Sequence, residues 1–205
     1  DWIEGHQFRW LLIFGHYLGP LQFISRALNI IYNISYKDFY SKIFEFCKKD
    51  TNSFLGKEYY EIENNLHKVL QNKRFWGGIV DGVGNINWNV DEATCIKLAN
   101  GNKQKFYDEI KQLILEEYPQ IDLSLLSEIL MYQKNRLSDP KSSYPFKTEY
   151  TYNIHAVIEN GESLKKHDNT IIFDAKNYNS DIFSWAKEVI WFGRRVGKYK
   201  TTATL

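Results

Sequence analysis

The stretch Ser35–Lys49, with the sequence SYKDFYSKIFEFCKK, contains the clearest secondary-structure signal in the chain. Its apolar residues recur at the spacing of one helix face, and its charged residues occupy the opposite face. Ser35 and Asp38 have the spacing of a capping box, with Asp in the place usually held by Glu or Gln. The pattern predicts an amphipathic helix with one buried face. The apolar positions are Tyr36, Phe39, Tyr40, Ile43, Phe44 and Cys47.

Two further helices are predicted before this stretch, over residues 3–18 and 21–33, with Leu18-Gly19-Pro20 between them. Proline suits the first turn of a helix, where its missing N–H has no partner to lose. Residues 10–25 carry no charge, but glycine and proline interrupt them, and they fall short of the ~20 apolar residues of a membrane span. We therefore expect buried helices, with an interfacial membrane hairpin as the lesser alternative.

Helical patterns continue after the stretch, over residues 57–72, 90–98 and 103–118. Another begins at residue 122 or 124 and reaches residue 137. Gln133 lies on the apolar stripe of this last helix, where it either satisfies a buried backbone group or faces a ligand.

Glycines separate two of these helices, four of them within residues 77–84. Gly82-Val83-Gly84 resembles the start of a dinucleotide-binding loop, but the third glycine is absent and no strand–turn–helix context surrounds it. We expect a structured loop or a short hairpin here. Asn89 and Glu92 then have the spacing of an N-cap with a Glu three residues later, and Asn100-Gly101 predicts the end of that helix.

After Ser138-Asp139-Pro140 the apolar pattern changes to period two, which predicts a strand over residues 146–158 with one buried face. Residues 170–173 form a plausible partner strand. A final helix over residues 181–192 is apolar nearly all round, so it should be buried or pack against another domain.

The predicted fold class is mainly α. A helical domain of about seven helices covers residues 1–139, and a small β-hairpin with a C-terminal helix covers residues 140–205. We expect the second part to pack on the first. Hydrophobic residues make up 43% of the chain and aromatic residues 16%, which favours a globular protein with an aromatic core.

The composition excludes several classes of function. The net charge is +1, which argues against a strongly basic DNA-binding protein, although a local patch remains open. Cys47 and Cys95 are too few and too far apart for a disulfide framework, a zinc site or an iron–sulfur cluster. Two buried thiols are typical of a reducing compartment, so we expect a cytoplasmic protein. No signal peptide is visible, and the start at Asp1 suggests a piece of a longer chain.

No recognised catalytic or metal-binding motif appears in the sequence. Near the end of the chain, however, four cations follow Gly193 within a few residues. They either form a solvated tail, contact phosphate or nucleic acid, or dock onto an acidic partner. These cations are Arg194, Arg195, Lys198 and Lys200.

Several short strings resemble, in this order, the C-terminal region of radical SAM enzymes that carry an N-terminal cobalamin-binding domain. The most specific is Ala186-Lys187-Glu188 leading into Trp191-Phe192-Gly193-Arg194-Arg195, with Gly197 after it. The others are Phe14-Gly15-His16, Gly19-Pro20-Leu21-Gln22-Phe23-Ile24, Ile34-Ser35-Tyr36, Phe39-Tyr40, Trp88, Asp91-Glu92-Ala93, Phe106-Tyr107, Glu109 and Tyr132-Gln133.

The resemblance implies an enzyme that uses S-adenosylmethionine, a 4Fe-4S cluster and cobalamin. With only two cysteines, this chain departs from the three-cysteine cluster motif of the family, so it would bind none of these cofactors itself. Its partners would be the upstream radical SAM and cobalamin domains, and its task would be to cap the barrel and shape the substrate pocket. We expect no catalytic or metal-binding residue here.

The residues that we regard as candidates for binding are Arg194, Arg195, Gln133, His16 and Glu92. Two alternatives to the enzyme fragment remain. The chain could be a non-enzymatic helical module that binds protein or RNA, or a stand-alone enzyme with a pocket that the sequence does not reveal.

Overall fold

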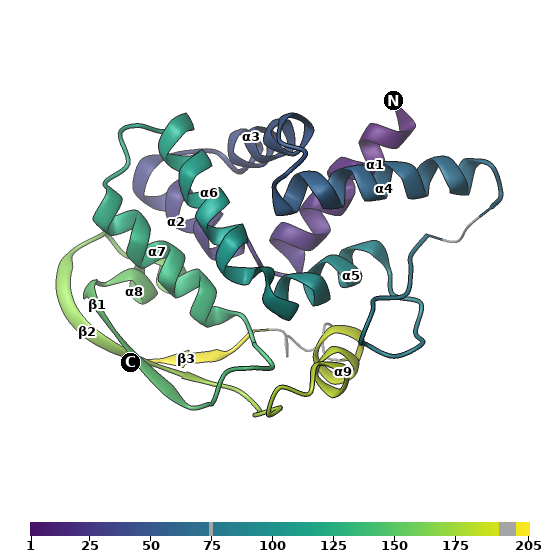
Figure 1. The fold of residues 1–205 in the computed structure, drawn as a ribbon. Coiled ribbons are helices and arrows are strands. Elements are labelled where there is room, and N and C mark those ends of the chain that lie inside the picture. Colours follow the sequence, from purple (N-terminus) through teal and green to yellow (C-terminus); the bar gives the residue numbers. More distant parts are fainter. Residues whose placement is uncertain (74–75, 193–199) are drawn as a thin grey trace.

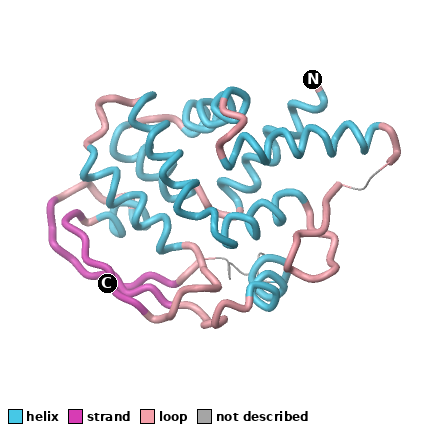
Figure 2. Tube along the Cα trace, in the orientation of Figure 1, coloured by secondary structure: helices cyan, strands magenta, loops and turns pink. Residues whose placement is uncertain are grey.

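The computed structural model describes residues 1–73, 76–192 and 200–205, and describes Phe192 by its backbone alone. Helices make up most of the molecule, and the strands lie together at one edge (Figures 1 and 2). This architecture confirms the mainly α fold with a small sheet. The helices are α1 (Trp2–Leu12), α2 (Gln22–Tyr32), α3 (Tyr36–Lys49), α4 (Phe54–Leu70), α5 (Val90–Lys97), α6 (Lys103–Glu117), α7 (Leu123–Arg136), α8 (Ile154–Asn160) and α9 (Ile182–Trp185). The π-helical segments are η1 (Ile13–Tyr17), η2 (Leu98–Asn102) and η3 (Ala186–Phe192).

Helix α3 forms as its sequence predicts. The Ser35 hydroxyl accepts a hydrogen bond of 3.0 Å from the Asp38 backbone N–H, which satisfies one of the free donors of the first turn. Five of the six predicted apolar positions are buried, and Tyr36 at the start of the helix is exposed. Helix α4 starts at Phe54, earlier than expected, because Ser53 caps it through the Gly56 N–H.

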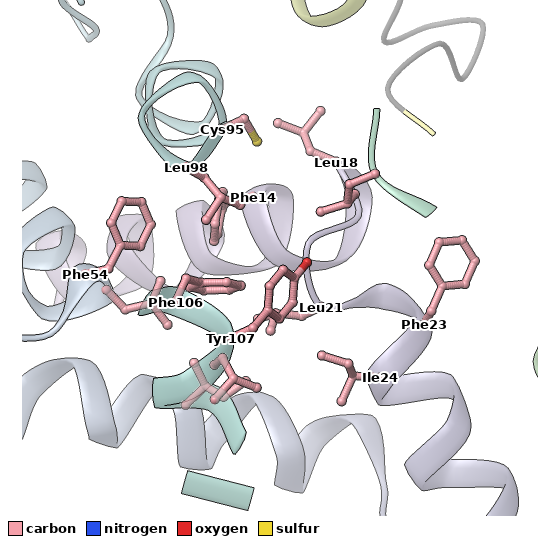
Figure 3. Packing of buried hydrophobic residues seen from close by; sticks show 14 of the residues in the cluster. Phe14, Leu18, Leu21, Phe23, Ile24, Phe54, Cys95, Leu98, Phe106 and Tyr107 are labelled. Atoms are coloured by element: carbon pink, nitrogen blue, oxygen red, sulfur yellow. The ribbon is translucent and has the colours of Figure 1, made fainter. Parts of the chain in front are cut away.

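Aromatic rings from distant helices form the centre of the core (Figure 3). The Phe106 ring of α6 makes edge-to-face contacts with Phe14 of η1 and Phe54 of α4, at centroid distances of 5.9 and 5.8 Å. Each such pair stabilises a protein by ~0.5–1.5 kcal/mol beyond the area that it buries. The Tyr107 hydroxyl donates to the Pro20 carbonyl at 2.9 Å, so even the polar end of this buried ring has a partner.

The glycine-rich segment between α4 and α5 forms a structured loop. Gly78 and Trp88 exchange two backbone hydrogen bonds of 2.9 Å, which close its ends. A Cβ atom at Gly77 would lie 2.3 Å from the Trp88 carbonyl oxygen, and the φ of Gly77 is 142°, so this position requires glycine. The helical chain that starts with α5 is interrupted at Gly101, with a φ of 109°, as the Asn100-Gly101 pair predicts.

The described strands form an antiparallel sheet in the order β1 (Phe146–Tyr152), β2 (Lys166–Asp174) and β3 (Thr202–Thr204). The hairpin of β1 and β2 was predicted, whereas β3 was not. The sheet packs on α7 through the Tyr132 ring, which contacts the rings of Tyr150 and Phe173 at 6.2 and 6.0 Å.

The prediction of one strand over residues 146–158 is wrong beyond Tyr152. Helix α8 begins at Ile154 and buries Ile154, Val157 and Ile158, which have helical spacing and were divided between the two faces of the expected strand. The Asn153 side-chain oxygen accepts a hydrogen bond of 2.7 Å from the Lys165 N–H and thereby fixes the chain where the strand changes to a helix. Gly161 then ends α8 in the left-handed conformation.

The predicted final helix corresponds to α9 followed by η3. Asp181 caps α9 through the Ser184 N–H, and the Trp185 ring nitrogen donates to the Ser138 hydroxyl at 3.1 Å. The segment is less enclosed than expected, since Phe183 and Trp191 are partly exposed. Across the described residues, no helix has both the length and the apolar character needed to cross a bilayer.

Candidate functional site

The junction between η1 and α2 brings together polar side chains from elements that are distant in the sequence. Gln133 of α7 lies beneath it and is fully buried. Its side-chain oxygen accepts from the N–H groups of Phe23 and Ile24 at 2.8 and 3.3 Å, and its amide group donates to the Gly19 carbonyl at 2.9 Å. Gln133 therefore satisfies the free backbone donors at the start of α2, which is the usual role of a buried glutamine.

Three cations lie around the Phe23 ring and the Glu159 carboxylate. The Arg136 guanidinium lies 4.7 Å from the centre of the Phe23 ring, and the Lys200 ammonium lies 5.8 Å from it. Arg26 joins them through Glu159, which it approaches to 3.8 Å while Arg136 pairs with the same carboxylate at 3.1 Å. We call Arg26, Arg136 and Lys200 the cation cluster.

The chain positions the cation cluster by backbone contacts at the end of α7. The Thr201 N–H donates to the Arg136 carbonyl at 2.8 Å, and the Thr201 hydroxyl donates to the Asn135 carbonyl at 2.9 Å. Arg136 returns a bond of 2.6 Å from its guanidinium to the Thr201 carbonyl. Residue 201 thus caps α7 and fixes Lys200 beside Gly19, where a Cβ atom would lie 3.0 Å from the Lys200 stem.

A hydrogen-bonded chain leads from Glu159 to a histidine. The Tyr132 hydroxyl lies 3.0 Å from a Glu159 carboxylate oxygen and 3.0 Å from His155 Nδ1. A carboxylate between two guanidinium groups can only accept, so Tyr132 donates its proton to Glu159. His155 Nδ1 must then donate to Tyr132, which leaves Nε2 unprotonated. The geometry therefore assigns the Nδ1–H tautomer to neutral His155.

Burial lowers the pKa of His155, the Glu159 carboxylate opposes this, and Arg136 adds to it. The pKa of His16 is lowered chiefly by burial and further by Lys200 and Arg26. The pKa of Lys200 is lowered by burial first and then by Arg136, with Glu159 acting in the opposite direction. Both histidines are therefore neutral at pH 7, and the positive charge at the junction comes from the cation cluster.

The structure brings two of the five predicted binding residues to this junction. His16 lies on η1 and contacts the Tyr40 hydroxyl through Nδ1 at 3.1 Å, while Gln133 lies beneath the same junction. Glu92 instead takes part in the capping box of α5, where it accepts from the Asn89 N–H at 3.2 Å. Arg194 and Arg195 lie outside the described residues.

Sequence reasoning did not identify Arg26, Arg136 and Glu159. Arg26 and Glu159 are the only Asp, Glu, Lys or Arg residues of α2 and α8, Arg136 shares α7 with Glu128 and Lys134, and none of the three lies in a motif or a charge run. Lys200 belonged to the predicted basic tail, which was the available signal for this site. The convergence itself depends on how α2, α7, α8 and the C-terminal strand pack, and no local pattern encodes that packing.

A groove of about 550 Å³ lies next to this site between α8 and β2. His155 lines it together with Asn153, Ala156, Glu162, Lys165, His167, Asn169, Thr170 and Leu205. Its opening is rimmed by exposed polar side chains, and it contains no set of groups arranged as a nucleophile and base.

The residues present do not suit a metal cluster. Cys47 and Cys95 are both free and buried, and burial raises the pKa of the Cys47 thiol, which opposes formation of the thiolate that a metal needs. No group of three or more His, Cys, Asp or Glu side chains within residues 1–73, 76–192 and 200–205 could hold a metal ion. An iron–sulfur cluster would need ligands from another part of the protein.

Comparisons with known protein families and curated proteins found no match to this chain. No model of a known protein family matches this sequence, and no curated protein matches it either.

Proposed function

We propose that this chain is the accessory C-terminal region of a cobalamin-type radical SAM enzyme, where it caps the barrel and shapes the substrate pocket. It is not catalytic alone. S-adenosylmethionine, the 4Fe-4S cluster and cobalamin would all be bound by upstream domains, because this chain offers two buried cysteines and no metal-binding group among its described residues.

One observation carries the proposal. The strings on which the resemblance depends are distant in sequence, yet their members contact one another in the fold. Gln133 binds the backbone of Gly19 and Phe23, and Tyr107 binds the Pro20 carbonyl. At the other end of the chain, the rings of Trp88 and Trp191 meet at 5.6 Å. These contacts place the matching strings in one packed core, as expected if they belong to a single domain.

The first test is the reading frame upstream of Asp1. We expect a three-cysteine cluster motif there, preceded by a cobalamin-binding domain. In the full-length protein, removing residues 1–205 of this chain should leave the spectroscopic signal of the reconstituted cluster while substrate turnover is lost. A start codon immediately before Asp1 would exclude the proposal.

The second candidate is a non-enzymatic helical module that binds protein or RNA. The cation cluster and the exposed aromatic side chains of Trp2 and Tyr17 favour it. RNA binding should weaken steeply with salt and should fall when Arg194 and Arg195 are replaced by Ala. RNA binding that does not change with salt concentration, or the absence of RNA binding, would exclude an RNA-binding module.

A further inference from the structure

The charges at the η1–α2 junction are unbalanced. Arg26 and Arg136 share the single carboxylate of Glu159, and no carboxylate among the described residues lies within 4.0 Å of Lys200. The undescribed positions, 74–75 and 193–199, contain no Asp or Glu in the sequence, so they cannot supply one. Two positive charges in the cation cluster therefore lack a counter-charge from this chain.

We propose that the cation cluster binds one phosphate or carboxylate group of a small-molecule ligand. This inference goes beyond the proposed function, because it concerns charges on this chain alone and would hold for an enzyme fragment or a binding module alike.

The geometry gives the three cations of the cluster different roles. Arg136 is 14% exposed and fixed, since one of its terminal nitrogens donates to the Thr201 carbonyl and the other to Glu159. Arg26 is 34% exposed and reaches Glu159 only at 3.8 Å, so its guanidinium can turn toward a ligand. Arg136 would supply a fixed field, while Arg26 and Lys200 would make the direct, charge-assisted bonds.

The Phe23 ring strengthens this arrangement. It forms an apolar floor beneath Arg136 and Lys200, so water is excluded from one side of both cations. Attraction between opposite charges is greater where the surroundings are less polar. Partial burial lowers the pKa of Lys200, and a bound anion would relieve that penalty.

A single anionic group suits this site better than a nucleic-acid backbone. Arg136 and Lys200 lie over one ring, Arg26 shares Glu159 with Arg136, and the Glu159 carboxylate would repel a second phosphate. The whole chain has a net charge of +1, whereas binding along a nucleic acid depends on an extended basic surface.

The test is titration of inorganic phosphate, and separately of acetate, into the 205-residue chain, with chloride holding the ionic strength constant. We expect saturable binding of one or both anions, and the comparison identifies which group the site prefers. Lys200→Met and Arg26→Gln should each weaken binding about tenfold, as expected for the loss of one hydrogen bond to a charged group. Arg26→Lys, which keeps the charge, should retain most of the affinity.

Matched controls are Lys37→Met and Arg9→Gln, which remove exposed cations elsewhere and should leave the affinity unchanged. Far-UV circular dichroism and urea unfolding establish that each variant is folded. Equal responses to phosphate, acetate and chloride would overturn the proposal, as would unchanged affinity in folded Lys200→Met and Arg26→Gln proteins. Binding of polyuridylate without competition from phosphate would also overturn it and would point to an RNA surface.

Discussion

On its inner face, the η1–α2 junction contains Gln133, whose amide pairs with the backbone of Gly19, Phe23 and Ile24. On its outer face, Arg26, Arg136 and Lys200 have one carboxylate among them. Both faces contain polar groups next to the same helix start. On the inner face, the Gln133 oxygen and amide group each have hydrogen-bond partners on the backbone, as a structural role requires. On the outer face, three positive charges share one carboxylate. That difference separates the part of the junction that holds the fold from the part available to a ligand.

The largest effect is expected from breaking the inner face. Gln133→Leu would leave the backbone N–H groups of Phe23 and Ile24 without their partner, and the Gly19 carbonyl would keep only the bond from the Gln22 N–H. We expect the free energy of unfolding to fall by about 3 kcal/mol, since a buried group that loses its partner costs ~1–3 kcal/mol. Urea denaturation measures this change.

The matched control is Gln112→Leu on the exposed face of α6, which should stay within ~0.5 kcal/mol of the wild type. A small effect at Gln133 would mean that water or a shift of α2 replaces its bonds, and the contrast between the two faces would then disappear.

The next effect lies between the faces, at Tyr132. Tyr132→Phe removes the hydroxyl that links His155 to Glu159, and we expect a loss of about 1–2 kcal/mol of unfolding free energy because both partners are partly buried. Nitrogen-15 NMR should show His155 protonated at Nδ1 in the wild type at pH 7 and a mixture of tautomers in the variant. An Nε2–H tautomer in the wild type would contradict the assigned direction of the bonds.

A smaller effect is expected from pH. The lowered pKa values of His16 and His155 mean that the unfolded chain binds more protons than the folded one as the pH falls below the unfolded value. Stability should therefore be fully present above about pH 6.5 and should decline toward pH 5. Because both rings are partly exposed, each should contribute less than ~1 kcal/mol after solvent screening.

Urea denaturation across this pH range tests the expectation. His16→Gln and His155→Gln should each flatten the decline. A stability that rises on acidification would show that the cation cluster does not oppose protonation of these rings.

The smallest effect should come from the outer face. Lys200→Met keeps the aliphatic stem beside Gly19 and removes a charge that the fold disfavours, as its lowered pKa indicates. We expect the unfolding free energy to remain within ~0.5 kcal/mol of the wild type or to rise slightly. A loss of several kcal/mol would give Lys200 a structural role like that of Gln133.

The parts of the fold that could be predicted from the sequence are those in which local pattern and tertiary burial agree. Helix α3 is one example, because its apolar face and its Ser35 cap both lie within a few residues. Helix α8 was missed because Ile154, Val157 and Ile158 follow directly on a true strand, and seven residues are too few to separate period two from period 3.6. Strand β3 is shorter still, and its pairing with β2 is set by distant residues.

Only some residues of the candidate site could be predicted from the sequence. His16 and Gln133 stood out as polar residues among apolar neighbours, and Lys200 stood out in a basic run. Arg26, Arg136 and Glu159 have no local feature that distinguishes them from other charged residues on helix surfaces. Arg26 and Arg136 meet at the Glu159 carboxylate because α2, α7 and α8 pack against one another.

The hydrogen bonds of Thr201 to the end of α7 affect the order in which the chain can fold during synthesis. During translation, the helices before residue 140 leave the ribosome long before residues 200–204. Until then, the Asn135 and Arg136 carbonyls lack the Thr201 bonds, β2 exposes the edge later covered by β3, and Arg136 lacks the carbonyl that holds it. The cation cluster can therefore assemble only after residues 200–204 have been made, so a nascent chain whose earlier helices have folded still lacks Lys200 and the contacts that hold Arg136.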